Sequence, residues 1–222
     1  MESTVVGAAV GRQLAHARLR RAITDGELVP GQRLVESDLV AMLGVNRNGV
    51  RLALDALAAE GLVERIPNRG ARVRTVSAEE AVAITECRMA LEGLIAAKAA
   101  TAATDDEIAG LRSHVAAMRE AVDGGELVKY SALIQQLHQM LRDAARQPTA
   151  AELIERLQAQ IVRHQFQLSL RPGRPRVSLA GLTAVVEAVA ARDPERAEAA
   201  VRAHLRTVIE ALGEQADRLP GR

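Results

Sequence analysis

The chain has 222 residues and a formal net charge of +1, and its 48% of hydrophobic residues is enough for one large or two modest packed domains. Aromatic residues make up only 1%, and a core of Ala, Leu, Val and Ile favours closely packed helices. The single cysteine, Cys87, excludes an internal disulfide, fits a reducing cytoplasm and is expected to be a small core residue. No apolar run reaches the roughly 20 residues of a membrane span, and residues 1–13 lack the features of a signal peptide.

Charge is distributed unevenly along the chain. Through Val76 there are 11 Arg, no Lys and 8 acidic residues, a net charge of +3, whereas the remainder has 18 basic and 20 acidic residues, a net charge of −2. A basic N-terminal segment ahead of an acidic remainder suits contact with a nucleic acid at one end of the protein.

Apolar residues at helical spacing predict three helices in the N-terminal segment. The first covers residues 11–28, and the second follows Glu36-Ser37, which can cap it. Gly44 supplies a sharp turn, and the third helix covers residues 46–61. The residues expected to face the core are Leu14, Leu19, Ile23 and Leu28 in the first helix, Leu39, Val40 and Leu43 in the second, and Val50, Leu54 and Leu57 in the third.

Two short β-strands are predicted after the third helix. Residues 62–66 and 71–76 are β-prone segments on either side of the turn at residues 67–70. The order of helix, helix, tight turn, helix and hairpin is the organisation of a winged helix-turn-helix. We therefore assign residues 1–76 to a DNA-binding domain.

The third helix carries polar residues that suit the reading of DNA. Arg47 and Arg51 lie one turn apart, opposite the apolar stripe, with Asn48 beside them. Guanidinium groups and an amide at the N-terminal end of a helix can meet guanine edges and phosphates in the major groove. Arginines on an isolated helix more often only solvate its surface, but the turn and the wing favour DNA contact here. The expected DNA contacts are Arg33, Ser37, Asn46, Arg47, Asn48, Arg51, Arg69 and Gly70.

From Ser77 onward the sequence predicts helices throughout. Ser77 and Thr104 can cap the first two of them, residues 171–178 form a Pro- and Arg-rich loop, and Asp193-Pro194 separates the last two helices. Six or seven antiparallel helices make a closed bundle whose interior can hold a ligand. The predicted fold is mainly α: a winged helix-turn-helix of three helices and a β-hairpin wing over residues 1–76, then an all-α antiparallel bundle over residues 77–222.

Both halves of the chain resemble parts of one known family. Residues 19–73 resemble the DNA-binding domain of GntR-family bacterial regulators, and the bundle resembles the FCD sensor domain of the FadR-like branch. The N-terminal match rests on Pro30-Gly31, Glu36, Leu43-Gly44-Val45, Arg47, Val50-Arg51, Ala53-Leu54, Glu60-Gly61-Leu62 and Arg69-Gly70. The match to FCD domains rests on Arg88, Leu91-Glu92, Leu137-His138 and residues 188–205.

The resemblance implies a homodimer that binds double-stranded DNA at a short palindromic operator, with an effector in the bundle that changes this affinity. It also implies that Arg47, Asn48, Arg51 and the wing at Gly70 face DNA. The sequence departs from the family's usual residues at Asn46, Asn48, Gly49 and Leu52. The two asparagines still offer hydrogen bonds, so base preference can shift while the binding mode survives. A glycine inside a helix costs up to about 1 kcal/mol relative to alanine.

Many FCD domains bind a divalent metal through one aspartate and three histidines, and this chain keeps two of those four positions. His138 and His204 match, whereas the aspartate position is Ile134 and the remaining histidine position is Leu182. Two neutral imidazoles without a carboxylate make a poor metal site. We therefore expect no cofactor, no divalent metal and a metal-free pocket. The alternative is that both histidines are buried polar residues hydrogen-bonded within the bundle.

Arginines that face the interior of the bundle can clamp a carboxylate effector, and Arg88 and Arg163 are the candidates. His164 is a further candidate, although a surface position suits it equally well. The expected effector-binding residues are Arg88, His138, Arg163 and His204.

The expected function is therefore a DNA-binding transcriptional regulator, a repressor, that acts on the cytoplasmic nucleoid and not at a membrane. A constitutive DNA-binding dimer whose bundle only dimerises remains the alternative. An enzyme is not expected, because the chain has only two lysines, Lys98 and Lys129, in ordinary helical settings. It also lacks a nucleophile with a paired base, a glycine-rich phosphate loop and a carboxylate dyad.

Overall fold

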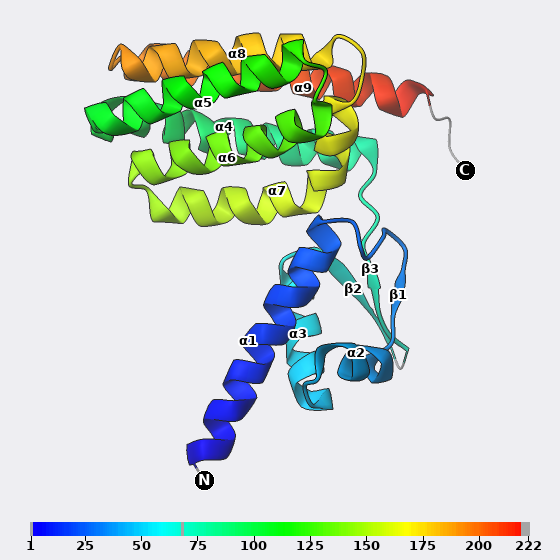
Figure 1. Cartoon of the computed structure of the whole chain (residues 1–222). Coiled ribbons are helices and arrows are strands. Elements are labelled where there is room, and N and C mark those ends of the chain that lie inside the picture. The colour runs from blue at the N-terminus through cyan, green and yellow to red at the C-terminus, as the bar shows by residue number, and fades with distance from the viewer. Residues whose placement is uncertain (1, 68, 219–222) are drawn as a thin grey trace. The chain divides into compact units, whose positions relative to one another are not determined.

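The computed structural model describes residues 2–67 and 69–218, and the chain divides into two compact units, Met1–Val76 and Ser77–Arg222 (Figure 1). As predicted, the described fold is mainly helical, with one small sheet. The first unit contains α1 (Glu2–Thr24), β1 (Arg33–Leu34), α2 (Glu36–Leu43), α3 (Arg47–Ala59), β2 (Val63–Ile66) and β3 (Gly70–Val73). The second contains α4 (Ala78–Ala102), α5 (Asp105–Asp123), α6 (Leu127–Ala145), α7 (Pro148–Ser169), α8 (Arg174–Ala190) and α9 (Pro194–Arg218).

The helix-turn-helix is built on α3, which packs against α1 and α2. The predicted apolar stripe of α3 is confirmed, because Val50, Leu54 and Leu57 are fully buried. The sharp turn before α3 is confirmed as well. Gly44 has a left-handed φ of 68°, and its amide donates a hydrogen bond to the carbonyl of Val40.

Two details of α1 and α2 differ from the prediction. Leu14, expected to face the core from α1, is 48% exposed, and the neighbouring Ala15 is buried in its place. The expected cap at Glu36-Ser37 is wrong, because Val35 is the N-cap residue and Glu36 is already the first residue of α2. The Glu36 carboxylate is therefore not used to cap its own helix.

The wing is a three-stranded antiparallel sheet in the order β1-β3-β2, one strand more than the predicted hairpin. The extra strand, β1, has only two residues, too few to show an alternating pattern in the sequence. Arg33 pairs with Arg72 and Leu34 pairs with Ala71. The segment that leads into α2 is therefore fixed to the wing by backbone hydrogen bonds.

Gly70 is required where β1 meets the start of β3. Its φ is +89°, a conformation that residues with a Cβ rarely adopt. A Cβ at this position would lie 2.6 Å from the carbonyl oxygen of Leu34, which is backbone and has little freedom to move. The glycine thus has a structural role in the wing, whatever it contacts on DNA.

Gly70→Ala is expected to lower the free energy of unfolding of the first unit by about 1–3 kcal/mol, because strain and a backbone clash add together. Chemical denaturation followed by circular dichroism measures the loss. Gly26→Ala is the matched control, because Gly26 also has a positive φ, +82°, but a Cβ there meets nothing within 4 Å. Equal losses in the two variants would show that the contact with Leu34 does not matter.

Six helices form the second unit as described, and α4 lies inside it, packed against α6, α7, α8 and α9 (Figure 1). The Ser77 hydroxyl caps α4 by accepting from the amide of Glu80, and Thr104 with Glu107 forms a capping box on α5. The predicted helix starts at these two residues are therefore confirmed.

Three further expectations have clear outcomes. The loop predicted at residues 171–178 is shorter, because α8 begins at Arg174 and a helix accepts Pro175 within its first turn. Cys87 is exposed, so its assignment to the core is wrong. No helix in the described part of the chain is both long enough and apolar enough to cross a membrane.

Candidate DNA-reading face and effector cavity

The polar residues of α3 that are predicted to read DNA are open to solvent. Asn48 is exposed, and the side chains of Arg47 and Arg51 are 66% and 58% exposed. In the wing, Arg69 is exposed and its carbonyl accepts a hydrogen bond from the Arg33 guanidinium at 3.4 Å. Both the helix and the wing therefore present cations that can reach phosphates or bases.

Two other predicted DNA contacts already form hydrogen bonds within the protein. Asn46 Oδ1 accepts from the amide of Gly49 at 2.8 Å and caps α3, so the side chain is held by the helix while its amide nitrogen can still donate to DNA. The exposed Ser37 hydroxyl donates to Asp38 at 3.2 Å. Leu52 is 41% exposed, and nothing in the structure explains its departure from the family pattern.

A cluster of charges that the sequence pattern does not predict lies beside α3. Glu36 of α2 lies among Arg47 and Arg51 of α3 and Arg65 of β2, all within 4.0 Å of its carboxylate. Arg65 also contacts Asp55 at 3.2 Å. Arg65 is not predicted as a DNA contact, because it lies in a strand whose exposed face the sequence pattern does not assign to DNA.

Two adjoining cavities lie inside the second unit, and His138 and His204 line both of them. The larger has a volume of about 60 Å³ and the smaller about 20 Å³. A cavity needs about 10–15 Å³ to hold one water, so the larger one admits a ligand of only a few heavy atoms. Its walls are Arg88, Tyr130, Ile134, His138, Gln165, Leu168, Ser169, Arg174, Pro175, Ser178, His204, Leu205 and Val208.

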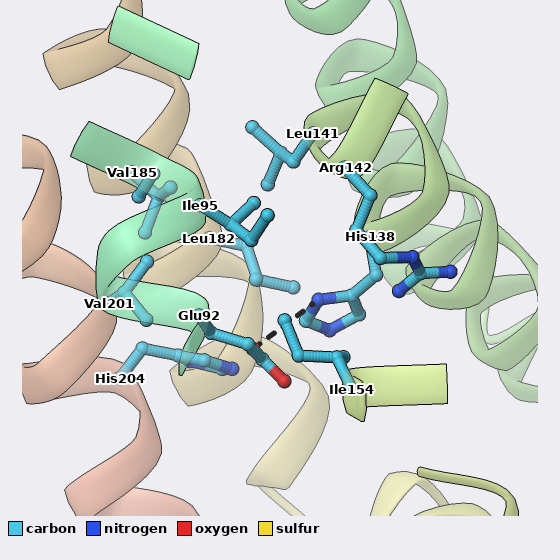
Figure 2. Close-up of a pocket in the computed structure, with 11 residues that line it drawn as sticks. Glu92, Ile95, His138, Leu141, Arg142, Ile154, Leu182, Val185, Val201 and His204 are labelled. Atoms are coloured by element: carbon cyan, nitrogen blue, oxygen red, sulfur yellow. Dashed lines mark ion pairs between the residues drawn. The ribbon is translucent and has the colours of Figure 1, made fainter. Parts of the chain in front are cut away.

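A buried ion pair stands between the histidines. Arg88 of α4 is fully buried, which agrees with the predicted inward orientation. It donates from Nε and Nη2 to Glu92 Oε1 at 2.8 and 2.5 Å. The other carboxylate oxygen lies 3.6 Å from His138 Nδ1 (Figure 2). Burial, the largest single influence, raises the pKa of the Glu92 carboxyl, but Arg88, His138 and His204 together outweigh it and the pKa is lowered overall. Glu92 is therefore a carboxylate that the protein supplies to its own arginine.

Both cavity histidines are neutral at pH 7. Burial lowers the pKa of His138 to about 4, against the opposing attraction of Glu92, and burial lowers the pKa of His204 to about 3. His204 packs on Gly181 of α8 so closely that a Cβ at Gly181 would lie 2.7 Å from His204 Nδ1. That nitrogen has no hydrogen-bond partner among the described residues. The bundle therefore holds an unsatisfied polar atom at its cavity.

Acidification from pH 6.5 to pH 4.5 is expected to destabilise the bundle. In this range the unfolded chain binds protons that the folded bundle excludes from His138 and His204, so stability falls as the pH falls. Each imidazole contributes up to about 1.4 kcal/mol per pH unit. Denaturant midpoints across this range measure the slope, which His138→Gln/His204→Gln should flatten and His114→Gln should leave in place. A slope that survives in the double variant would contradict the assignment.

The structure changes which arginines belong to the cavity. Arg163 is exposed, so the expectation that it faces inward is wrong, and His164 is half-buried. Arg174, at the start of α8, lines the larger cavity, is half-buried and forms no ion pair with a described carboxylate within 4.0 Å. Arg142, 8% exposed, lines the smaller cavity and, within the described residues, donates only to the amide oxygens of Gln139 and Gln158.

One of the missed residues had a visible signal in the sequence. Glu92 follows Arg88 by four residues on one helix, and this spacing brings the two heads together. Arg174 had no such signal, because it was assigned to a loop. When the Gln165 amide is turned so that its oxygen faces Arg88, that oxygen accepts from the guanidinium as well.

The residues present do not fit a divalent metal. Ile134 and Leu182 line the two cavities where the family's metal-binding members have an aspartate and a histidine. The nearest carboxylate, Glu92, is bound by Arg88, and no group of three or more His, Cys, Asp or Glu is placed to hold a metal within residues 2–67 and 69–218. Two imidazoles alone lack the ligand number that such ions require.

A winged helix-turn-helix with exposed arginines, followed by a helical bundle with a polar internal cavity, defines a DNA-binding regulator with its own small-molecule sensor. Comparison with known families agrees. Residues 12–73 match the gntR family of bacterial regulatory proteins, and residues 83–207 match the FCD domain. The chain therefore belongs to the GntR family: it is a DNA-binding transcriptional regulator with an FCD effector-binding domain, and not an enzyme.

Individual relatives support the same assignment. The chain is 28% identical to the HTH-type transcriptional repressor RspR of Escherichia coli K12 over 194 residues, 87% of this chain and 85% of RspR. It is 29% identical over 191 residues to a probable D-xylose utilization operon transcriptional repressor of Paenarthrobacter nicotinovorans, 85% of this chain and 83% of the relative. The solved structure of E. coli McbR/YncC has the same fold, with a TM-score of 0.77 at 21% identity over 92% of this chain and 98% of that one.

Proposed function

We propose that the protein is a homodimeric repressor that binds a short palindromic operator and releases it when a small anionic effector enters the bundle. Two relatives that align over more than four-fifths of the chain are named as repressors, which supports the sign of regulation. The exposed arginines of α3 and the wing support the DNA contact. The protein acts on the nucleoid in the cytoplasm.

The observation that carries the effector class is the half-buried Arg174 at the larger cavity, which forms no ion pair within 4.0 Å among the described residues and is attracted only from further away by Glu210 and Glu214. Arg88 is neutralised by Glu92 and both histidines are uncharged at pH 7, so Arg174 carries the remaining positive charge among the side chains that line the larger cavity. Guanidinium groups bind carboxylates through paired hydrogen bonds. A carboxylate of a few heavy atoms satisfies both the charge and the volume, and it needs no metal.

The mechanism is thermodynamic linkage between the two units. An effector that binds better to the arrangement in which the two recognition helices of the dimer are misplaced lowers operator affinity by the ratio of its two affinities. The same linkage requires that operator DNA weakens effector binding by the same factor.

Three measurements test the proposal. Binding-site selection from random duplexes is expected to return a palindrome, and sedimentation of the bound complex is expected to show two chains per duplex. Calorimetric titration with two- to five-carbon carboxylic acids is expected to find a ligand that also releases the operator. Arg174→Gln should lower the affinity for that ligand about tenfold or more, whereas a substitution at the exposed Arg163, Arg163→Gln, should leave it unchanged.

The alternative of a constitutive DNA-binding dimer predicts a different result. No acid would bind in the calorimeter, and operator affinity would not respond to any of them. Titration with divalent metals belongs to the same series, because saturable metal binding would contradict the metal-free cavity.

A further inference from the structure

The carboxylate of Glu36 lies at the centre of three arginines. Its Oε2 is 3.0 Å from Nε of Arg51 and 4.0 Å from Nε of Arg47, and its Oε1 is 3.6 Å from Nη2 of Arg65. The Glu36 side chain is only 16% exposed, whereas those of Arg47 and Arg51 are more than half exposed. The guanidinium groups therefore cover the carboxylate and still reach solvent.

An acidic group in this position works against binding to DNA in general. Each cation that neutralises a phosphate strengthens binding to any sequence, and a nearby carboxylate offsets part of that attraction. The group of Glu36, Arg47, Arg51 and Arg65 has a formal charge of +2, where the arginines alone would have +3. The presence of a carboxylate here must therefore have a different physical explanation.

The hydrogen bonds between Glu36 and Arg51 provide that explanation. Its Nε donates to both oxygens of Glu36, at 3.0 and 3.2 Å, while neither of its Nη groups forms a hydrogen bond within the described residues. The two Nη groups are those that pair with O6 and N7 of guanine or with a phosphate. An arginine fixed through Nε loses less conformational freedom when its open end binds.

The local fold explains why the carboxylate is available. Val35 is extended and provides no side-chain cap, and Glu36 is the first residue of α2. The preceding residues, Arg33 and Leu34, are paired with β3 in the sheet. Glu36 therefore leaves a fixed strand and is directed to α3 and β2 rather than to the amides of its own helix.

We infer that Glu36 is a positioning residue for DNA recognition, which aims Arg51, and more loosely Arg47 and Arg65, at the operator while it weakens attraction to other DNA. The inference rests on the DNA-reading role proposed for α3. Specificity is the difference between the binding free energies for the operator and for other DNA. Glu36 increases this difference because it favours operator binding and weakens binding to other DNA.

Glu36→Gln separates charge from shape, because glutamine is similar in size and its oxygen can still accept one hydrogen bond from Arg51. The test measures dissociation constants by fluorescence anisotropy for the selected operator and for a scrambled duplex, at several salt concentrations. Glu36→Gln is expected to bind the scrambled duplex more tightly than the wild type and the operator no better. The ratio of the two affinities should fall roughly tenfold.

Glu64→Gln is the matched control. Glu64 is an exposed carboxylate of the same unit that accepts from Arg72 at 2.8 Å and does not contact α3 arginines. Its loss removes the same charge, so both affinities should rise by a similar factor and their ratio should not change. Thermal unfolding of both variants checks that each is folded.

The outcomes separate the inference from the function on which it rests. If Glu36→Gln changes both affinities by the same factor as Glu64→Gln, Glu36 acts only as a charge and the inference is overturned. If the folded wild type does not distinguish its selected operator from scrambled DNA, the proposed function itself fails, and the inference fails with it.

Discussion

Arg51→Ala is expected to abolish specific operator binding, with a loss of about a hundredfold or more, while the protein stays folded. A bidentate contact from arginine to a base is worth about 1–3 kcal/mol of discrimination, and a dimer on a palindrome makes each contact twice. Arg51 is 58% exposed, and exposed substitutions usually change stability by no more than about 0.5 kcal/mol. Anisotropy with labelled operator and thermal unfolding measure the two quantities separately.

Arg47→Ala is expected to behave in the same way, because Arg47 is 66% exposed one turn away on α3. Arg21→Ala is the control: Arg21 is an exposed arginine of the same unit, 84% accessible, and its only ion pair within the described chain is with Asp25. Its loss should change affinity for all DNA slightly and equally. Full operator affinity in folded Arg47→Ala and Arg51→Ala would refute the DNA-reading face.

Arg88→Met is expected to lower the free energy of unfolding by about 3–5 kcal/mol, the largest stability effect in the bundle. Arg88 is fully buried and Glu92 is 7% exposed, so methionine would leave a carboxylate without its partner in a site closed to water. Without Arg88, burial would raise the pKa of Glu92, so the variant should regain stability as the pH falls and the carboxyl is protonated.

The double variant Arg88→Met/Glu92→Leu distinguishes a broken pair from a missing residue. Removing both charges together should restore most of the stability, because no buried charge is left uncompensated. Arg112→Met/Glu187→Leu is the control pair, since Arg112 and Glu187 join α5 to α8 with about half of each side chain exposed and should matter little. A double variant as unstable as Arg88→Met would show that the loss comes from packing.

Much of the fold could be predicted because local patterns determine it. The stripe of Val50, Leu54 and Leu57, the turn at Gly44 and the caps at Ser77 and Thr104 all depend on residues a few positions apart. β1 could not be predicted, because its two residues become a strand only by pairing with β3, more than thirty positions away.

The sites depend on distances between elements, which local patterns do not contain. Arg163 and Arg174 are both arginines near the α7–α8 connection, and only the packed structure shows that Arg174 lines the cavity. The contact of His204 with Gly181 depends on how closely α8 and α9 approach each other. The cluster of charges around Glu36 likewise depends on how α2, α3 and β2 pack together.

The exposed Cys87 is a natural site for attaching a fluorescent label. It is the only cysteine of the chain, it is an exposed residue, and it directly precedes Arg88 on α4. A maleimide fluorophore would therefore attach once per chain, without any engineered substitution, one residue from the arginine at the cavity. In a dimer the two identical labels would form a distance pair, and energy transfer between them could follow the sensor as ligand and operator are added.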